Sequence, residues 1–73
     1  MPGMTNTDLG NAIKWGFSIM SQGMSARYGT LNGQLYKQFT PGGNVFADQY
    51  PPKPIDAKQY AIAEALHKIN SRH

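Results

Sequence analysis

Few side chains in this 73-residue chain are of the types that perform acid–base or metal chemistry. The chain has no cysteine to act as a nucleophile or metal ligand, and its acidic residues share no catalytic motif. His67 has no second histidine at ligand spacing, so we expect it to be structural or solvent-facing rather than a metal ligand or base. We therefore predict that the protein is not an enzyme and has no catalytic residues, cofactor or metal. Its acids are Asp8, Asp48, Asp56 and Glu64.

Two short stretches have both a structural and a binding interpretation. Gly42–Gly43 lies within "TPGGN", which is typical of a turn, although consecutive glycines can also form a small anion-binding nest. The stretch "PPKP" over 51–54 excludes helix and favours extended polyproline geometry. It is either a strap over the surface or a ligand for an aromatic groove on another protein. For both stretches we favour the structural interpretation.

The charge of the chain permits acidic partners without requiring them. The formal net charge is +3 and the isoelectric point is about 9.5, but only 15% of the residues are charged. Dedicated DNA-binding modules concentrate more basic residues on one face, whereas here the basic residues are spread along the whole chain. We therefore treat direct contact with nucleic acid as secondary, and a small nucleic-acid-binding module as the alternative to a protein-binding role.

The length and composition predict one small domain over residues 1–73. A chain of this size buries only about 60% of its unfolded surface, so we expect a thin core. The lack of cysteine fits a reducing cytoplasm, and no signal peptide or membrane span is recognised. We expect a cytoplasmic monomer that does not associate with membranes. Mobile segments are expected over 1–6, in a Gly/Pro-rich loop over 40–54, and over 71–73.

The N-terminal third shows a helical spacing of apolar residues. We predict a first helix over Thr7–Met24, with Asp8 at its positive end. Gly10 and Gly16 weaken this helix by about 1 kcal/mol each relative to alanine, unless they allow close packing against a neighbour. The apolar residues at spacings of three and four are Leu9, Ala12, Ile13, Phe17, Met20 and Met24.

The middle of the chain predicts a β-hairpin. Asn32–Gly33 between two strand-like runs is the strongest short hairpin signal, because a type I′ turn needs positive φ at both central residues. This turn places Leu31 opposite Gln34 and Tyr28 opposite Lys37. The predicted core face carries Ala26, Tyr28, Thr30, Leu35, Lys37 and Phe39, and the other face carries Arg27, Gly29, Leu31, Gln34, Tyr36 and Gln38.

The C-terminal part predicts a helix after the proline-rich strap. Asp56 is a good N-cap, with Gln59 three residues later, and Ala57 to about Asn70 is rich in helix formers. A third strand is an option over "VFADQY", residues 45–50. The predicted fold is α+β: helix, hairpin with an optional third strand, proline-rich strap, helix. The expected apolar stripe of the last helix is Ile62, Ala63, Ala65, Leu66 and Ile69.

Protein binding accounts for more of the composition than nucleic-acid binding. Too many aromatic side chains compete for a thin core, and Tyr, Trp, Met and Arg are enriched at protein interfaces. Trp15 fits either the core or an interface anchor. The hairpin, which has cations and no acid, is the expected centre of the surface. The expected partner-binding residues are Arg27, Leu31, Tyr36, Lys37 and Lys53, followed by Lys14 and Trp15.

Three stretches together resemble a known class of proteins: "TNTDLGNAIKWGF", "RYGTLNGQLYKQF" and "DAKQYAIAEALHKIN". With the full length, they resemble the small RNA polymerase-binding transcription regulators of bacteriophages, such as the one from a Xanthomonas phage. This resemblance implies binding to host RNA polymerase in the bacterial cytoplasm, inhibition of initiation at host promoters, and antitermination on phage templates. It implies no functional residue. A phage inhibitor of another host protein is a further alternative.

Overall fold

The computed structural model describes residues 5–21, 23–42 and 49–70 of the chain. Its four strands form one antiparallel sheet in the order β1-β2-β3-β4, so each strand pairs with its neighbour in sequence. The α+β class is therefore confirmed. In chain order the elements are α1 (Asn6–Ala12), β1 (Lys14–Ser21), β2 (Met24–Leu31), β3 (Gln34–Thr40), β4 (Lys53–Ile55) and α2 (Ala57–Asn70).

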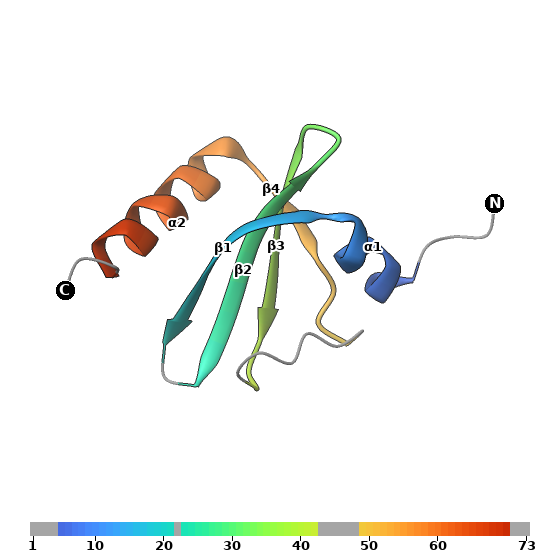
Figure 1. Cartoon of the computed structure of the whole chain (residues 1–73), viewed down its shortest axis with the longest axis horizontal. Helices are drawn as coiled ribbons and strands as arrows, with labels where there is room; N and C mark the ends of the chain where they lie inside the picture. The colour runs from blue at the N-terminus through green and yellow to red at the C-terminus, as the bar shows by residue number, and fades with distance from the viewer. Residues whose placement is uncertain (1–4, 22, 43–48, 71–73) are drawn as a thin grey trace.

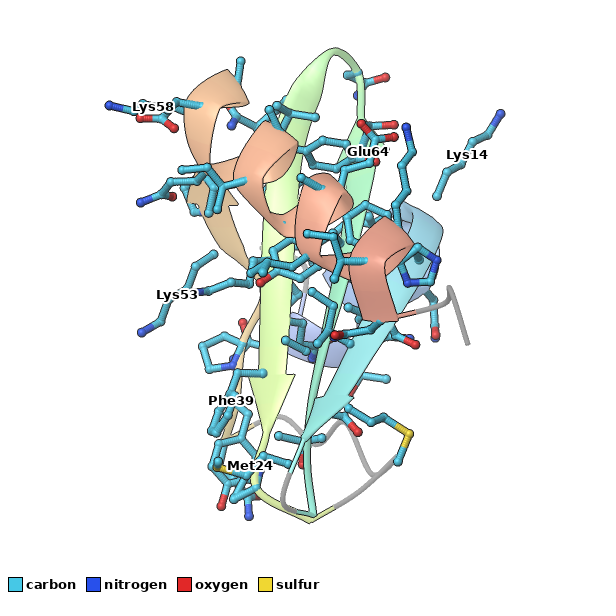
Figure 2. The ribbon with its side chains drawn as sticks, turned by 90° about the vertical axis from the view of Figure 1, so that its left-hand side faces the viewer. Lys14, Met24, Phe39, Lys53, Lys58 and Glu64 are labelled. Atoms are coloured by element: carbon cyan, nitrogen blue, oxygen red, sulfur yellow. The ribbon has the colours of Figure 1, made fainter. Side chains whose placement is uncertain are left out.

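The sheet separates the two helices (Figure 1). The long helix α2 lies on one face and packs against β1, while the short helix α1 lies on the other side. Helix α2 packs most closely against β1 and crosses the upper part of the sheet obliquely (Figure 2). The end of β3 around Phe39 lies below α2 and is not covered by it (Figure 2).

The predicted hairpin is confirmed residue by residue. Strands β2 and β3 pair with Leu31 opposite Gln34 and Tyr28 opposite Lys37. Asn32 has a φ of 52° and Gly33 a φ of 83°, and these positive angles are the ones that a type I′ turn requires. The local turn chemistry thus sets the register of the two central strands.

The prediction of one helix over Thr7–Met24 is wrong beyond Ala12. Thr5 caps α1 with a capping box, in which its hydroxyl accepts a hydrogen bond from the Asp8 N–H, and Ile13 already has extended backbone angles. The following residues form β1 instead, with a bulge between Trp15 and Phe17. Aromatic and β-branched residues favour a strand. Glycine destabilises a helix, whereas pairing with β2 gives the backbone of this segment hydrogen bonds in the sheet. Thr5 and Asn6 are therefore part of the α1 structure rather than of a tail.

A close approach of β1 to β2 occurs at Gly29. A Cβ on Gly29 would collide with the Lys14 carbonyl oxygen, and would lie only 2.8 Å from the Trp15 Cα and 2.9 Å from the Ile13 side chain. Ile13 is among the few large side chains that are nearly fully buried, at 4% exposure. The junction between α1 and β1 thus packs directly onto the bare backbone of β2.

The proline-rich stretch is not only a strap, because it contains strand β4. Lys53 lies opposite Lys37, and Ile55 opposite Leu35. Pro54 lacks an N–H, so its place in a short strand at the edge of the sheet is one that proline tolerates. The optional third strand over 45–50 lies mostly outside the described residues, as do the expected tail residues 1–4 and 71–73. The expected loop over 40–54 is interrupted at both ends, by β3 and by β4.

The predicted C-terminal helix is confirmed in its extent and its cap. The Asp56 carboxylate accepts a hydrogen bond of 2.8 Å from the Gln59 N–H, and the Tyr60 N–H donates to the Asp56 carbonyl. Neither described helix is long and apolar enough to cross a membrane.

Candidate protein-binding surface

An aromatic cluster fixes α2 on the sheet. The Phe17 ring stacks on Tyr28 and on His67, with centroids 5.1 Å apart in each pair, and meets the Tyr60 ring edge-on at 5.5 Å. Burial in this cluster raises the pKa of the Tyr28 phenol. The side of α2 that faces the sheet therefore carries Tyr60, Ala63 and His67, and of these Ala63 is 4% exposed.

The predicted apolar stripe of α2 is mostly not in the core. Ile62, Leu66 and Ile69 are 54%, 48% and 60% exposed. Their helical spacing places them on one side of α2, next to the side that carries Ala63. Because α2 faces the sheet with Tyr60, Ala63 and His67, this stripe stays largely exposed, and its residues Ile62 and Leu66 only line a groove beside Lys37.

The sheet next to α2 is also partly uncovered. Phe39 and Met24 are 42% and 40% exposed, although we expected Phe39 in the core. Figure 2 shows α2 crossing the upper part of the sheet, with Phe39 and Met24 below it. We call the exposed side chains on this face of the sheet and on the adjoining side of α2 the open face. It comprises Met24, Lys37, Phe39, Lys53, Ile62, Leu66 and Ile69.

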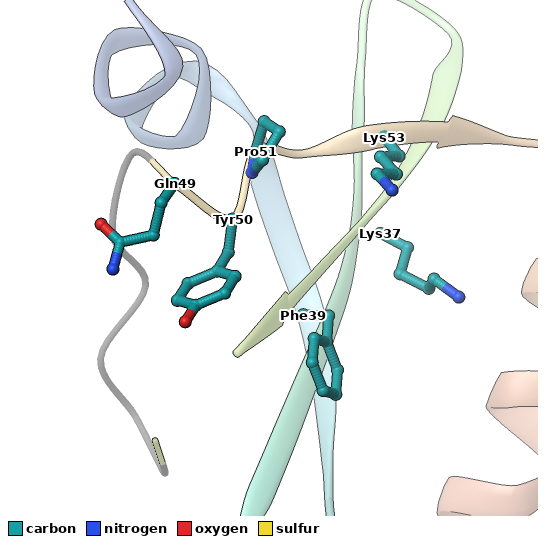
Figure 3. Close-up of a pocket in the computed structure, with 6 residues that line it drawn as sticks. All are labelled: Lys37, Phe39, Gln49, Tyr50, Pro51 and Lys53. Atoms are coloured by element: carbon teal, nitrogen blue, oxygen red, sulfur yellow. The ribbon is translucent and has the colours of Figure 1, made fainter. Parts of the chain in front are cut away.

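Two of the expected binding residues meet on the open face. Lys37 of β3 and Lys53 of β4 are directly opposite in the sheet, and both are exposed. Figure 3 shows them side by side, with the Phe39 and Tyr50 rings at the end of β3. A cavity of about 320 Å³ lies here. Its lining is Lys37, Phe39, Gln49, Tyr50, Pro51 and Lys53.

Two other expected binding residues, Arg27 and Trp15, form a half-buried cluster on the α1 side. The Arg27 guanidinium lies 4.1 Å from the centre of the Trp15 ring and donates to the Gln38 side-chain oxygen from Nε at 2.9 Å and from Nη2 at 2.6 Å. Gln38 in turn donates to the Tyr50 carbonyl, and the Trp15 N–H donates to the Gly10 carbonyl. Burial lowers the pKa of Arg27. These contacts hold α1 and the segment before β4 against the sheet.

The remaining expected binding residues lie apart from the open face. Tyr36 lies opposite Gly29, and its neighbour in the hairpin, Leu31, is likewise half-buried on the α1 side of the sheet. Lys14 is exposed, but it lies in β1, at the opposite edge of the sheet from Lys53 in β4 (Figure 2). The structure therefore brings together Lys37 and Lys53 in one place and Arg27 and Trp15 in another.

The apolar part of the open face was not predicted from the sequence, because Phe39 and the apolar stripe of the last helix were expected to face the core. A signal was present in the last helix, where Tyr60 and Ala63 form one stripe and Ile62, Leu66 and Ile69 form a second. Two stripes are wider than a helix lying on one small sheet can bury.

The described residues contain no group of three or more His, Cys, Asp or Glu side chains placed to hold a metal ion. Comparison with known proteins gives no match of any kind: no family model, no curated protein sequence and no solved structure shows significant similarity to this chain.

Proposed function

We propose that this chain is a non-enzymatic domain that binds a large protein through its open face. The observation that carries the proposal is the gathering of exposed apolar side chains there. Of the large apolar residues that are exposed in the described structure, only Met20 lies elsewhere. Contiguous apolar surface rimmed by polar groups is characteristic of protein interaction sites.

The arrangement of the open face is that of an interface. Phe39, Leu66 and the neighbouring apolar residues supply area that a partner can desolvate, while Lys37 and Lys53 stand at its edge. The charges supply orientation and the apolar centre supplies affinity.

The proposed partner is bacterial RNA polymerase. The support for this partner is the resemblance of the chain to small phage regulators of transcription. A domain of this size acts by occupying a surface and so blocking a competing factor, which would inhibit initiation at host promoters. Antitermination on phage templates is proposed on the same resemblance, and the site of action would be the cytoplasm of the host.

Binding of purified RNA polymerase to the labelled full chain tests this function. We expect saturable binding that Phe39→Ser or Leu66→Ser weakens at least about tenfold, since buried interface anchors contribute on the order of 2 kcal/mol. Met20→Ser is the matched control, because Met20 is 58% exposed and pairs with Ser25, which faces away from the open face. No binding by the wild type, or equal losses in all three variants, would reject the proposal.

A further inference from the structure

We propose that the Lys37–Lys53 pair and the cavity beside it recognise an acidic side chain that lies next to a large apolar side chain in a protein segment. This inference rests on the protein-binding function proposed above. It adds the chemistry of the segment that the open face takes.

Two like charges lie side by side at the edge of the sheet. Lys37 and Lys53 lie directly opposite on neighbouring strands, where like charges are destabilising. Among the described residues, neither ammonium group has an acidic partner, and both are exposed. A carboxylate bound between them would turn this repulsion into two attractive contacts. Side-chain arrangements that destabilise the folded chain are characteristic of functional sites, where binding a ligand offsets the cost.

A cavity lies beside the lysine pair. Its volume of about 320 Å³ is at the small end of the range for ligand pockets, which suits one large side chain of a partner. Phe39, Tyr50 and Pro51 give it apolar walls, and no acid is among the described residues that line it. An apolar side chain of the partner can therefore enter this cavity. The acidic side chain next to it in the partner then lies at the two ammonium groups, away from any described carboxylate of this chain.

The open face continues from Lys37 onto α2. Lys37 also lines a second groove, between the sheet and α2, whose other lining residues include Ile62 and Leu66. A segment whose acidic residue lies at Lys37 can therefore place apolar residues on both sides of it. Within the part of the chain that the structure describes, no acid lines this groove.

A protein segment fits these features better than a nucleic acid does. Two cations neutralise too few phosphates for firm binding at physiological salt, because affinity for nucleic acid grows with each phosphate neutralised. The exposed stripe of Ile62 and Leu66 also offers nothing to a phosphate backbone, whereas it can bury apolar side chains of a peptide.

Selection from a displayed library of random dodecapeptides on the full chain tests the inference. We expect the selected peptides to contain Asp or Glu within a few residues of Phe, Trp or Leu. Their synthetic versions should shift the backbone amide NMR signals of Lys37, Phe39 and Lys53. Replacing the peptide acid by its amide, or Lys37 or Lys53 by glutamine, should weaken binding about tenfold, as expected for a close charge pair at an interface.

Lys68→Gln is the control matched in charge. Lys68 lies six residues beyond Ile62, and this spacing places it on a different side of α2. Its substitution should leave the affinity unchanged. Selection of neutral or basic peptides, no selected peptide at all, or equal losses in Lys37→Gln and Lys68→Gln would overturn the inference. A single-stranded oligonucleotide that displaces the peptides with higher affinity would also overturn it, in favour of a nucleic-acid site.

This experiment separates the inference from the proposed function. If RNA polymerase binds in a way that depends on Phe39 but not on Lys37 or Lys53, the proposed function stands and the acidic ligand is rejected. If acidic peptides bind at Lys37 and Lys53 and the polymerase does not bind, the inference stands and the partner is rejected.

Discussion

Gln38 shows how single polar residues hold this small domain together. It is 3% exposed, accepts two hydrogen bonds from Arg27 and donates one to the Tyr50 carbonyl. A single side chain therefore ties β2, β3 and the segment before β4 together. In a domain whose described apolar core is small, such buried polar contacts define a large part of the structure.

Gln38→Ala should lower the free energy of unfolding by about 1–3 kcal/mol, because it removes two hydrogen bonds from the charged Arg27 guanidinium and one to the Tyr50 carbonyl. Urea denaturation measures this loss. Gln34→Ala is the control, since Gln34 makes its hydrogen bonds at an exposed position. Equal stabilities of the two variants would contradict the role of Gln38.

Tyr28→Phe should make the stability less dependent on pH in the alkaline range. Burial raises the pKa of Tyr28 in the folded chain, so its contribution is present below the unfolded pKa of about 10 and is lost as the pH rises through the folded pKa. The variant keeps the ring on Phe17 but cannot ionise. Urea denaturation at a series of alkaline pH values should give a shallower fall for the variant, and an identical fall would count against this account.

At the scale of elements, local chemistry fixes the central hairpin and the start of α2. The Asn32–Gly33 turn and the Asp56 cap could be predicted from the sequence because each depends on residues within a few positions of one another. Strand β1 could not be predicted in this way. Phe17 and Met20 have a spacing compatible with a helix, and only their pairing with Tyr28 and Ser25 of β2 makes them part of a strand.

Replacing Asn32 and Gly33 by two valines should disrupt the hairpin, since both residues would be forced to positive φ. NMR signals characteristic of β2 and β3 report on this change. Unchanged strand signals would refute the dependence of the register on the turn.

Gly29→Ala should destabilise the pairing of β1 with β2, because the new methyl group would collide with the backbone around Lys14 and Trp15. A loss of about 1–3 kcal/mol in urea denaturation is expected. Gly42→Ala provides the comparison, since the nearest atom to its added methyl group would be the Thr40 hydroxyl at 3.9 Å. The account fails if both variants retain the stability of the wild type.

At the scale of the whole molecule, the position of α2 determines the open face. The sequence predicts the helix, but the exposure of Ile62 and Leu66 depends on which strand the helix packs against. A helix that lay over the end of β3 would cover Phe39 and leave less apolar surface. Helix α2 instead packs most closely against β1 and leaves Phe39 exposed, and this is why Lys37 and Lys53 could be proposed from the sequence while their apolar neighbours could not.

We propose that RNA polymerase binds the open face. The most direct test of this proposal is NMR cross-saturation transfer from unlabelled polymerase to the methyl groups of the otherwise deuterated chain. We predict that Met24, Ile62, Leu66 and Ile69 lose intensity while Met20 does not. Loss centred on Leu31 of the α1 side, or no loss at any methyl group, would contradict the claim.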